Sequence, residues 1–220
     1  MAHDVNVVDL QQKPEAFTNL YREACADTEA RAKVPLLEVT QETGAPPLLL
    51  VESLAICEFL QEECVTGGER QVTSAERYGA RLWATLFSNW FSYIPILKAA
   101  PGSDEEAQAI DQLKAGMRAA DAYLRQVPRA GEGGPFLLGK AFSLAEVATA
   151  PFAMRFAKVL PGLRPSIQPN ELMAQEGLTR LSEWLDAVCA RPSCTATIPD
   201  DETLTQNYSK MLERMKGMAA

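Results

Sequence analysis

Two short apolar segments joined by a Gly/Pro-rich turn, with a helix directly after the second, place the strongest constraint on how this chain folds. The first segment, residues 33–39, is apolar and β-branched and carries Pro35 just inside it. Because proline has no N–H to donate to a strand ladder, the segment predicts an edge strand. Val51 closes a second predicted strand, and Glu52 and Ser53 then open a helix whose apolar face is Leu54, Ile56, Phe59 and Leu60. The unpaired N–H groups of such a helix start attract a carboxylate.

The order and spacing of these residues resemble the glutathione site of the cytosolic glutathione transferases. In that family, the residue before a cis-proline offers its backbone N–H and C=O to the cysteinyl part of glutathione, and a Glu/Gln-Ser pair holds the γ-glutamyl end. The matching residues here are Val34 and Pro35 for the first contact and Glu52 and Ser53 for the second. The resemblance therefore implies that the chain binds glutathione, as a cosubstrate or as a ligand.

Residues 8–17 extend the resemblance upstream, because they are similar to the second strand and following loop of omega-like and related members. In those proteins a lysine before the proline meets the glycine carboxylate of glutathione, and by analogy this role falls to Lys13. Each residue alone also has a simpler interpretation. Pro35 would be a trans edge proline, since only about 5–6% of X–Pro bonds in folded proteins are cis, and Glu52 with Ser53 would be an ordinary helix cap. Taken in order, the residues favour the glutathione site.

Length and composition bear on domain organisation. With 220 residues, 47% of them hydrophobic and 23% charged, the chain is predicted to be globular with two compact halves. Helical patterns follow the turn at Gly67 and Gly68, so we expect an N-terminal domain over residues 1–66 and a helical domain over 72–218. The resemblance implies an α/β plus all-α fold, with a partial thioredoxin-like domain followed by an all-helical glutathione transferase C-terminal domain.

Charge, histidine content and cysteine spacing exclude several classes of function. The formal net charge is -8 without a Lys/Arg run, so neither nucleic acid nor a membrane is an expected partner. His3 is the only histidine, which argues against Ser-His or Cys-His catalysis. The five cysteines lack metal-ligand spacing, so no metal site is expected. The polar start of the sequence lacks a secretory signal, and the expected location is cytoplasmic.

The second half of the sequence contains helix start signals and regular apolar stripes. Thr73 or Ser74 can cap a helix that Pro95 bends or ends. Ser103 begins another helix, with three acidic residues in its first turn and a stripe of Ile110, Leu113, Met117, Ala120 and Leu124. Two further amphipathic stretches complete the predicted bundle, residues 178–188 and 202–215.

Residues 136–147 contain a second local signature. Ser143 and Glu146 match an S-x-x-E capping box, in which each side chain accepts a hydrogen bond from the backbone of the other residue. Following a Phe-Leu-Leu-Gly loop, the box resembles that of the buried central helix in the helical domain of glutathione transferases, where an aspartate often takes the place of the glutamate. The resemblance implies a role in folding and not in chemistry. Pro151 is expected to kink this helix without ending it.

One part of the family's site has no match in this sequence. Members normally begin with a strand, a loop carrying Tyr, Ser or Cys, and a helix, whereas this sequence starts at the segment that resembles their second strand, residues 5–10. The catalytic residue is therefore unknown, and either an N-terminal piece is lacking or the chain is a degenerate, noncatalytic member. Without its usual partner, the second strand would have unpaired edges. Cys25 is an alternative nucleophile, but a helix face shared with Leu20 and Thr28 favours a packing role.

Interdomain clefts with apolar walls are common ligand sites, and three residues are candidates for a substrate cavity: Trp90, Tyr93 and Arg155. Trp83 and Phe87 are instead predicted to be core. The resemblance implies a homodimer that binds glutathione and, if active, transfers it to a small hydrophobic or electrophilic molecule or to a mixed disulfide. The alternative is a noncatalytic binding or scaffold protein on the same fold, because a fold alone does not imply a function.

Overall fold

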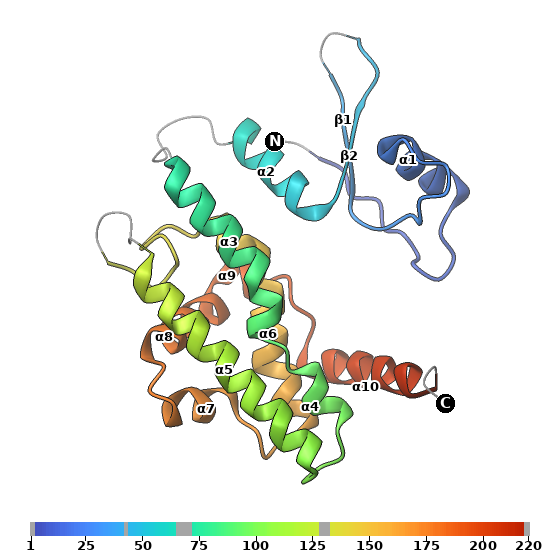
Figure 1. Ribbon diagram of the computed structural model, residues 1–220. Coiled ribbons are helices and arrows are strands. Elements are labelled where there is room, and N and C mark those ends of the chain that lie inside the picture. The colour runs from blue at the N-terminus through green and yellow to red at the C-terminus, as the bar shows by residue number, and fades with distance from the viewer. Residues whose placement is uncertain (1–2, 42–43, 65–71, 128–132, 218–220) are drawn as a thin grey trace. The chain divides into compact units, whose positions relative to one another are not determined.

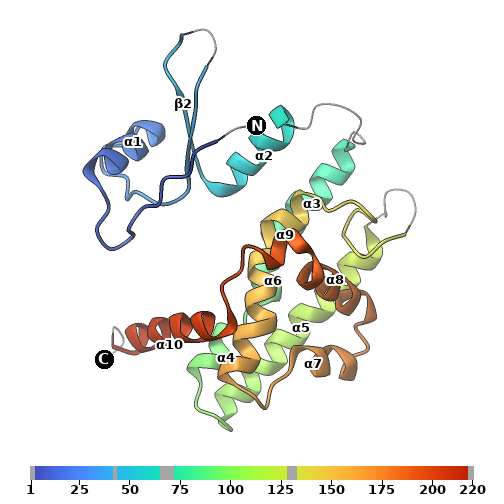
Figure 2. The same cartoon turned by 180° about the vertical axis from the view of Figure 1, so that it is seen from behind.

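The chain divides into two compact units, Met1–Gln71 and Val72–Ala220 (Figures 1 and 2). The computed structural model describes residues 3–41, 44–64, 72–127 and 133–217. Within these residues, the first unit combines helices with a small sheet, and the second has helices and two isolated bridges in its 136–141 loop. The predicted fold class, a partial thioredoxin-like domain followed by a helical domain, is confirmed.

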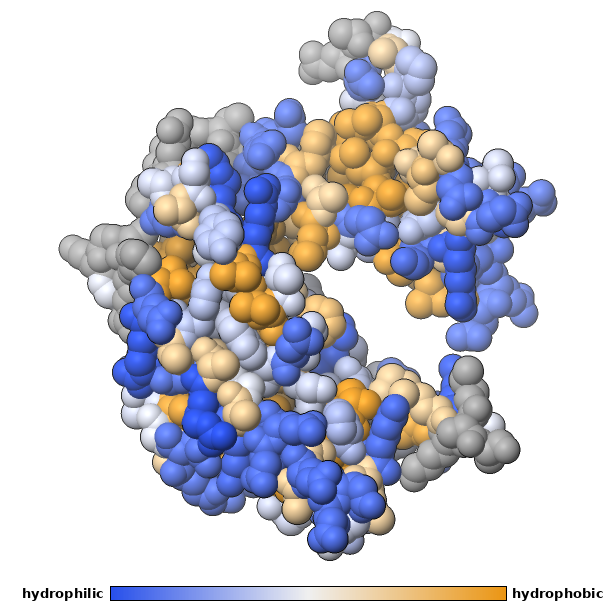
Figure 3. Space-filling model, in the orientation of Figure 1, coloured by the Kyte–Doolittle hydropathy of each residue, from blue (hydrophilic) through white to orange (hydrophobic). Residues whose placement is uncertain are grey.

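The N-terminal unit is built on an antiparallel hairpin with one helix before it and one after it. Helix α1 (Glu15–Cys25) precedes strands β1 (Leu36–Val39) and β2 (Leu48–Val51), and α2 (Ser53–Cys64) follows directly. The helices α1 and α2 lie on opposite sides of the hairpin in both ribbon views (Figures 1 and 2). None of the strand residues is fully buried, and Figure 3 shows apolar surface gathered over the hairpin.

The strand expected over residues 5–10 does not form. These residues have no regular secondary structure, and the side chains of Val5 and Val7 are 76% and 94% exposed. Among the described residues no strand pairs with this segment, so its N–H and C=O groups have no ladder that would select strand geometry.

The prediction that Leu20, Cys25 and Thr28 share one face of a helix is also wrong. Helix α1 ends at Cys25, because Ala26 adopts a left-handed conformation (φ 50°) and its N–H bonds back to the carbonyl groups of the last turn. Thr28 therefore lies beyond the helix, in a turn.

The second unit contains helices that match most of the predicted start signals. Thr73 caps α3 with a complete capping box, and Ser103 caps α5 by accepting from the N–H of Glu106. Pro95 does not bend α3, which ends at Trp90, but lies in the first turn of α4, where a missing N–H has no cost. The helices are α3 (Ser74–Trp90), α4 (Ile94–Lys98), α5 (Asp104–Gln126), α6 (Leu144–Leu163), α7 (Pro169–Gln175), α8 (Thr179–Ala190), α9 (Pro192–Thr195) and α10 (Asp201–Gly217).

Helix α6 is the centre of this unit and packs against α3, α7, α8 and α10. It continues through Pro151, as expected. Trp83 and Phe87 of α3 are buried, which confirms them as core, and the Trp83 ring lies 5.0 Å from that of Trp184 on α8. No helix in the described segments is both long and apolar enough to cross a lipid bilayer.

Helices α3 and α5 approach each other closely at Gly116. A Cβ at this position would lie 2.3 Å from the carbonyl oxygen of Trp90, which is shorter than any real contact. The hydrogen side chain of glycine therefore sets the distance between the two helix backbones. The expected stripe of α5 faces the core here, with Leu113, Met117, Ala120 and Leu124 buried and Ile110 packed at its edge.

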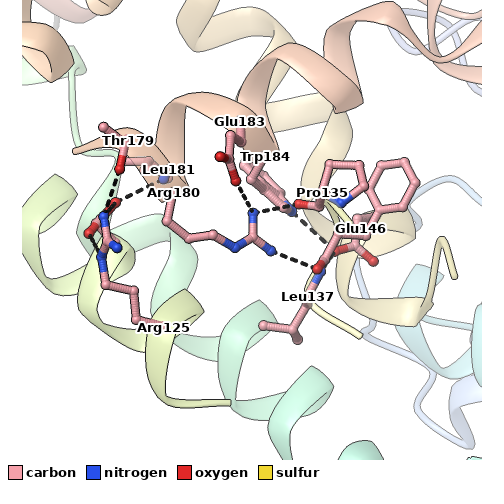
Figure 4. A network of polar contacts seen from close by, with 11 residues as sticks. Arg125, Pro135, Leu137, Glu146, Thr179, Arg180, Leu181, Glu183 and Trp184 are labelled. Atoms are coloured by element: carbon pink, nitrogen blue, oxygen red, sulfur yellow. Dashed lines mark hydrogen bonds and ion pairs between the residues drawn. The ribbon is translucent and has the colours of Figure 1, made fainter. Parts of the chain in front are cut away.

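The N-terminus of α6 is organised by the carboxylate of Glu146 (Figure 4). The Ser143–Glu146 capping box is present, and both the N–H and the hydroxyl of Ser143 donate to Glu146 Oε2, at 2.9 and 2.8 Å. The other oxygen, Oε1, accepts from the N–H of Leu137 at 2.7 Å and from the indole of Trp184 at 3.1 Å. One buried side chain thus joins the 136–139 loop, the start of α6 and the middle of α8.

Helix α8 is tied to its surroundings by further buried polar contacts. The guanidinium of Arg180, which is 2% exposed, donates to the carbonyl groups of Pro135 and Phe136 at 2.6 and 2.7 Å (Figure 4). The carboxylate of Asp121 on α5 accepts from the N–H of Leu181 at 2.9 Å. Because these groups are buried, each needs its partner to avoid an uncompensated loss of hydration.

Candidate functional site

The hairpin brings the two parts of the predicted site to the same end of the sheet. Leu36 pairs with Val51 in the antiparallel register, so the residues just before β1 face those just after β2. Val34 and Pro35 precede β1, and their peptide bond is cis. Glu52 and Ser53 follow β2. Both segments are exposed, which leaves this end of the hairpin accessible to a ligand.

Glu52 has an unusual backbone conformation at the start of α2. Its φ angle is +67°, in the left-handed region that residues other than glycine and asparagine rarely adopt. Its carbonyl oxygen accepts a hydrogen bond from the N–H of Ile56. Ser53 is the first residue of α2, which contains 12 residues. Glu52 therefore directly precedes the first turn of α2, whose N–H groups carry a partial positive charge.

Two lysines add positive charge around this hairpin end. The ammonium of Lys13 donates to the carbonyl oxygen of Ala32 at 2.8 Å, which places Lys13 alongside the chain that leads into Val34. Lys33 was not singled out from the sequence, and its Nζ lies 4.0 Å from the carboxylate of Glu52. Both members of this ion pair are about two-thirds exposed, at 68% and 69%, so the pair is held weakly.

Tyr21 of α1 is a second residue near Glu52 that the sequence interpretation missed. It is 3% exposed and packs against Phe17, with ring centroids 6.4 Å apart. Burial raises the pKa of its hydroxyl, and the neighbouring Cys25 and Glu52 raise it further. The i, i+4 spacing of Phe17 and Tyr21 is the signal that would have identified the inward face of α1.

The hairpin end therefore combines backbone groups next to Pro35, one carboxylate, one hydroxyl, free N–H groups at a helix start and two ammonium groups. Such a set can bind a small peptide that carries both an ammonium and carboxylates. No group of three or more His, Cys, Asp or Glu side chains suited to a metal ion occurs in the described parts of the chain.

The candidates for the substrate cavity separate into two clusters within the helical unit. Trp90 faces α5, with its ring 5.4 Å from Trp83 and 5.5 Å from Tyr123. Tyr93 instead faces α6 and α10, where its ring lies 6.3 Å from that of Tyr208. The structure thus brings Tyr93 together with α10, a long-range contact that no sequence spacing indicated, and places Trp90 elsewhere.

Arg155 belongs to the cluster of Tyr93. It lies on α6, is half-buried, and its guanidinium carbon is 5.3 Å from the centroid of the Phe152 ring. Its positive charge lowers the pKa of Tyr93, but burial and a hydrogen bond with Tyr208 outweigh this effect and hold that pKa well above its usual value. Tyr93 therefore remains a protonated hydrogen-bond donor across the physiological range.

Comparison with known proteins provides the family context for this geometry. Residues 103–187 match the family model described as glutathione S-transferase, C-terminal domain. No curated protein matches the sequence. Among solved structures, the trimeric glutathione transferase TDR1 of Leishmania is similar with a TM-score of 0.67 at 20% identity, over 91% of this chain and 41% of that chain. The chain thus spans less than half the length of that transferase.

Two further structures are similar over nearly the whole chain. Glutathione transferase Omega 3C from Trametes versicolor gives a TM-score of 0.65 at 20% identity, covering 96% of this chain and 79% of that chain. Rice GST1, solved in complex with glutathione, gives a TM-score of 0.65 at 18% identity, covering 95% and 84%. At these identities the similarity shows a common fold.

Proposed function

Since the chain has the fold of the glutathione transferase superfamily and carries its C-terminal domain, as the sequence resemblance predicted, we propose that it binds glutathione and transfers it to an electrophile or a mixed disulfide. The observation that carries the proposal is the hairpin register, which sets Val34 and Pro35 opposite Glu52 and Ser53. Two segments 17 positions apart in the sequence thereby face one ligand.

Each end of glutathione has a matching group in this arrangement. The backbone of Val34 pairs with the cysteinyl unit, and the carboxylate of Glu52 binds the γ-glutamyl ammonium. The γ-glutamyl carboxylate accepts from the Ser53 hydroxyl and from the N–H groups that begin α2. Lys13 meets the glycine carboxylate, because its ammonium has three donors and the bond to Ala32 uses one.

The chemistry then belongs to the bound thiol. A thiolate is the nucleophile, and binding that favours the thiolate over the thiol increases its reactivity at neutral pH. With an electrophile, the sulfur forms a C–S bond as the leaving group departs. With a mixed disulfide, the thiolate attacks one sulfur and the other leaves as a thiolate. No side chain of this chain is assigned to thiol activation.

Calorimetric titration of the full chain with reduced glutathione tests the binding step. The Glu52→Ala variant loses a charge-assisted contact, and we expect its dissociation constant to rise at least about tenfold. Glu38→Ala is the matched control, because Glu38 is an exposed carboxylate of β1 that pairs with Leu49, away from the Glu52 end of the hairpin. Its affinity is expected to equal that of the unsubstituted chain.

The outcomes separate the two functions that the fold allows. Saturable binding that is weakened by Glu52→Ala and not by Glu38→Ala supports the glutathione site, and a transferase assay follows. A folded chain that does not bind glutathione contradicts the proposal and favours the noncatalytic binding or scaffold alternative.

We also propose that the protein is a homodimer. The apolar surface of the N-terminal unit includes Leu48 and Leu54, which are 40% and 47% exposed, and exposed apolar surface of this kind marks interaction sites. Leu54→Glu is expected to shift the mass measured by light scattering from dimer to monomer. Leu10→Glu, at a leucine that is 54% exposed and lies outside the sheet and helices, is the control and is expected to leave the mass unchanged.

A cytoplasmic location accords with the cysteine content. Cys25, Cys57, Cys189 and Cys194 are free thiols, and proteins of reducing compartments keep thiols in this form. The same compartment supplies reduced glutathione. Fractionation of cells that express the tagged chain tests the location.

A further inference from the structure

Two tyrosines and one arginine from separate parts of the helical unit form a polar cluster. Tyr93 precedes α4, Arg155 lies on α6 and Tyr208 lies on α10. The rings of Tyr93 and Tyr208 are stacked, with centroids 6.3 Å apart and planes 30° apart. Tyr93 is 7% exposed, whereas Tyr208 and Arg155 are half-buried, so the cluster reaches from the core to the surface.

Helix α10 is fixed on α6 in a way that sets the position of Tyr208. Lys158 of α6 forms an ion pair with Asp201 in the first turn of α10. One turn later along each helix, a Cβ on Gly162 would lie 2.9 Å from Thr205 Oγ1, so the absence of a side chain allows close approach. Tyr208 follows Thr205 by three positions and therefore extends the same face of α10.

The charge of Arg155 is not neutralised within the part of the chain that the structure describes. No carboxylate there forms an ion pair with it; its guanidinium carbon lies 5.3 Å from the Phe152 ring centroid, and its charge acts on the Tyr93 hydroxyl, whose pKa it lowers. Phe152 is 54% exposed, so an aromatic face lies open beside the guanidinium. A guanidinium next to hydroxyl donors and an aromatic ring is complementary to an aromatic ligand that carries a carboxylate.

We propose that Tyr93, Arg155 and Tyr208 form a carboxylate-binding subsite that selects aromatic acids as acceptor substrates. Arg155 binds the carboxylate, the Tyr208 hydroxyl donates a hydrogen bond to it while accepting from Tyr93, and the ring of the acid packs on Phe152. The use of this subsite in transfer rests on the proposed glutathione function, but carboxylate binding does not, because all of its residues lie in the helical unit.

The test compares two aromatic electrophiles that differ in charge, 4-chloro-3-nitrobenzoate and 4-chloro-3-nitrobenzamide. Calorimetric titration of the full chain without glutathione is expected to show the benzoate binding at least about tenfold more tightly than the benzamide, as expected for a charge-assisted contact. Arg155→Gln is expected to remove this preference. Tyr208→Phe is expected to weaken benzoate binding about threefold to tenfold, because it deletes one hydroxyl and keeps the ring.

Arg77→Gln is the matched control, because Arg77 is an exposed arginine at the start of α3 in the same unit. It is expected to bind the benzoate as the unsubstituted chain does, which shows that a general loss of positive charge is not the cause. Equal affinity for benzoate and benzamide, or benzoate affinity unchanged by Arg155→Gln, overturns the subsite. Circular dichroism verifies that each variant is folded, and Tyr208→Phe provides an independent readout if Arg155→Gln is not.

A second measurement distinguishes failure of the subsite from failure of the proposed function. When glutathione is added, its thiolate attacks the chlorine-bearing carbon, a C–S bond forms, the C–Cl bond breaks and chloride leaves. Selective benzoate binding without conjugation supports the subsite and contradicts the transferase function for this acceptor. Conjugation of both electrophiles without preference in binding or rate supports the function and overturns the subsite.

Discussion

The indole nitrogen of Trp184 donates to the carboxylate of Glu146 at 3.1 Å, and both side chains are completely buried. The same carboxylate accepts from the N–H of Leu137 and from both the N–H and the hydroxyl of Ser143, so one side chain accepts four hydrogen bonds. A buried carboxylate with such partners holds the 136–139 loop, α6 and α8 in fixed positions relative to one another.

Replacement of Glu146 by alanine is expected to lower the free energy of unfolding by about 3–5 kcal/mol, because buried N–H and O–H donors lose their acceptor. Urea unfolding followed by circular dichroism measures the change. Glu183→Ala removes a glutamate of α8 whose side chain is 60% exposed, and is expected to change stability by less than about 0.5 kcal/mol. Similar losses in the two variants would contradict the role of Glu146.

Replacement of Ser143 by alanine is expected to cost about 1 kcal/mol, the usual loss for an N-cap. The hydroxyl both accepts from the N–H of Ala145 and donates to Glu146. Ser88→Ala serves as the control, because Ser88 is exposed in the last turn of α3, where alanine is a better helix former. An unfolding midpoint unchanged by Ser143→Ala would remove the case for the capping box.

Gly116→Ala is expected to destabilise the helical unit by about 2 kcal/mol or more, since the new Cβ meets the backbone of Trp90 at 2.3 Å and the helices must separate. Gly79→Ala is the matched comparison within α3. Its Cβ would be 3.7 Å from the nearest side-chain atoms, an ordinary contact, so we expect a gain of about 0.5–1 kcal/mol from helix propensity. Thermal unfolding of both variants measures the opposite signs, and a loss in Gly79→Ala equal to that in Gly116→Ala would count against the close approach.

The Cys189 thiol is expected to react slowly with iodoacetamide. Burial, first of all, and the nearby Asp186 raise its pKa from 9.0 to about 11, so its thiolate at pH 8 is about 100-fold less populated than that of an ordinary thiol. Peptide mapping by mass spectrometry is expected to show alkylation at least about tenfold slower in the folded chain than in guanidinium. Raising the pH toward 11 is expected to accelerate the folded-state reaction, and equal rates in the two states would contradict the assignment.

The local signals in the sequence predicted the local structure well. Thr73, Ser103 and Ser143 begin helices because a cap depends only on the next few residues. Residues 5–10 were predicted as a strand from the family resemblance and have no regular structure, because a strand depends on a partner and not only on its own residues. Tertiary pairing therefore limits what a β pattern can predict.

In the candidate sites too, contacts between sequence neighbours could be predicted and long-range contacts could not. Glu52 and Ser53 are adjacent in sequence and were identified as a pair, and the hairpin register then sets them opposite Val34. The stacking of Tyr93 on Tyr208 joins residues 115 positions apart, and no spacing rule connects them. Such contacts are set by the packing of α10 on α6, and only the folded structure shows them.

Glu52 occupies a backbone conformation that suits glycine better than glutamate. A left-handed conformation costs a side chain of this kind about 1–2 kcal/mol, and glycine would adopt it freely. The exposed Lys33 at 4.0 Å offsets little of that cost. Glycine at position 52 would relieve this strain, so the stability of the fold does not account for the glutamate, and its conformation accords with the ligand contact proposed for its carboxylate.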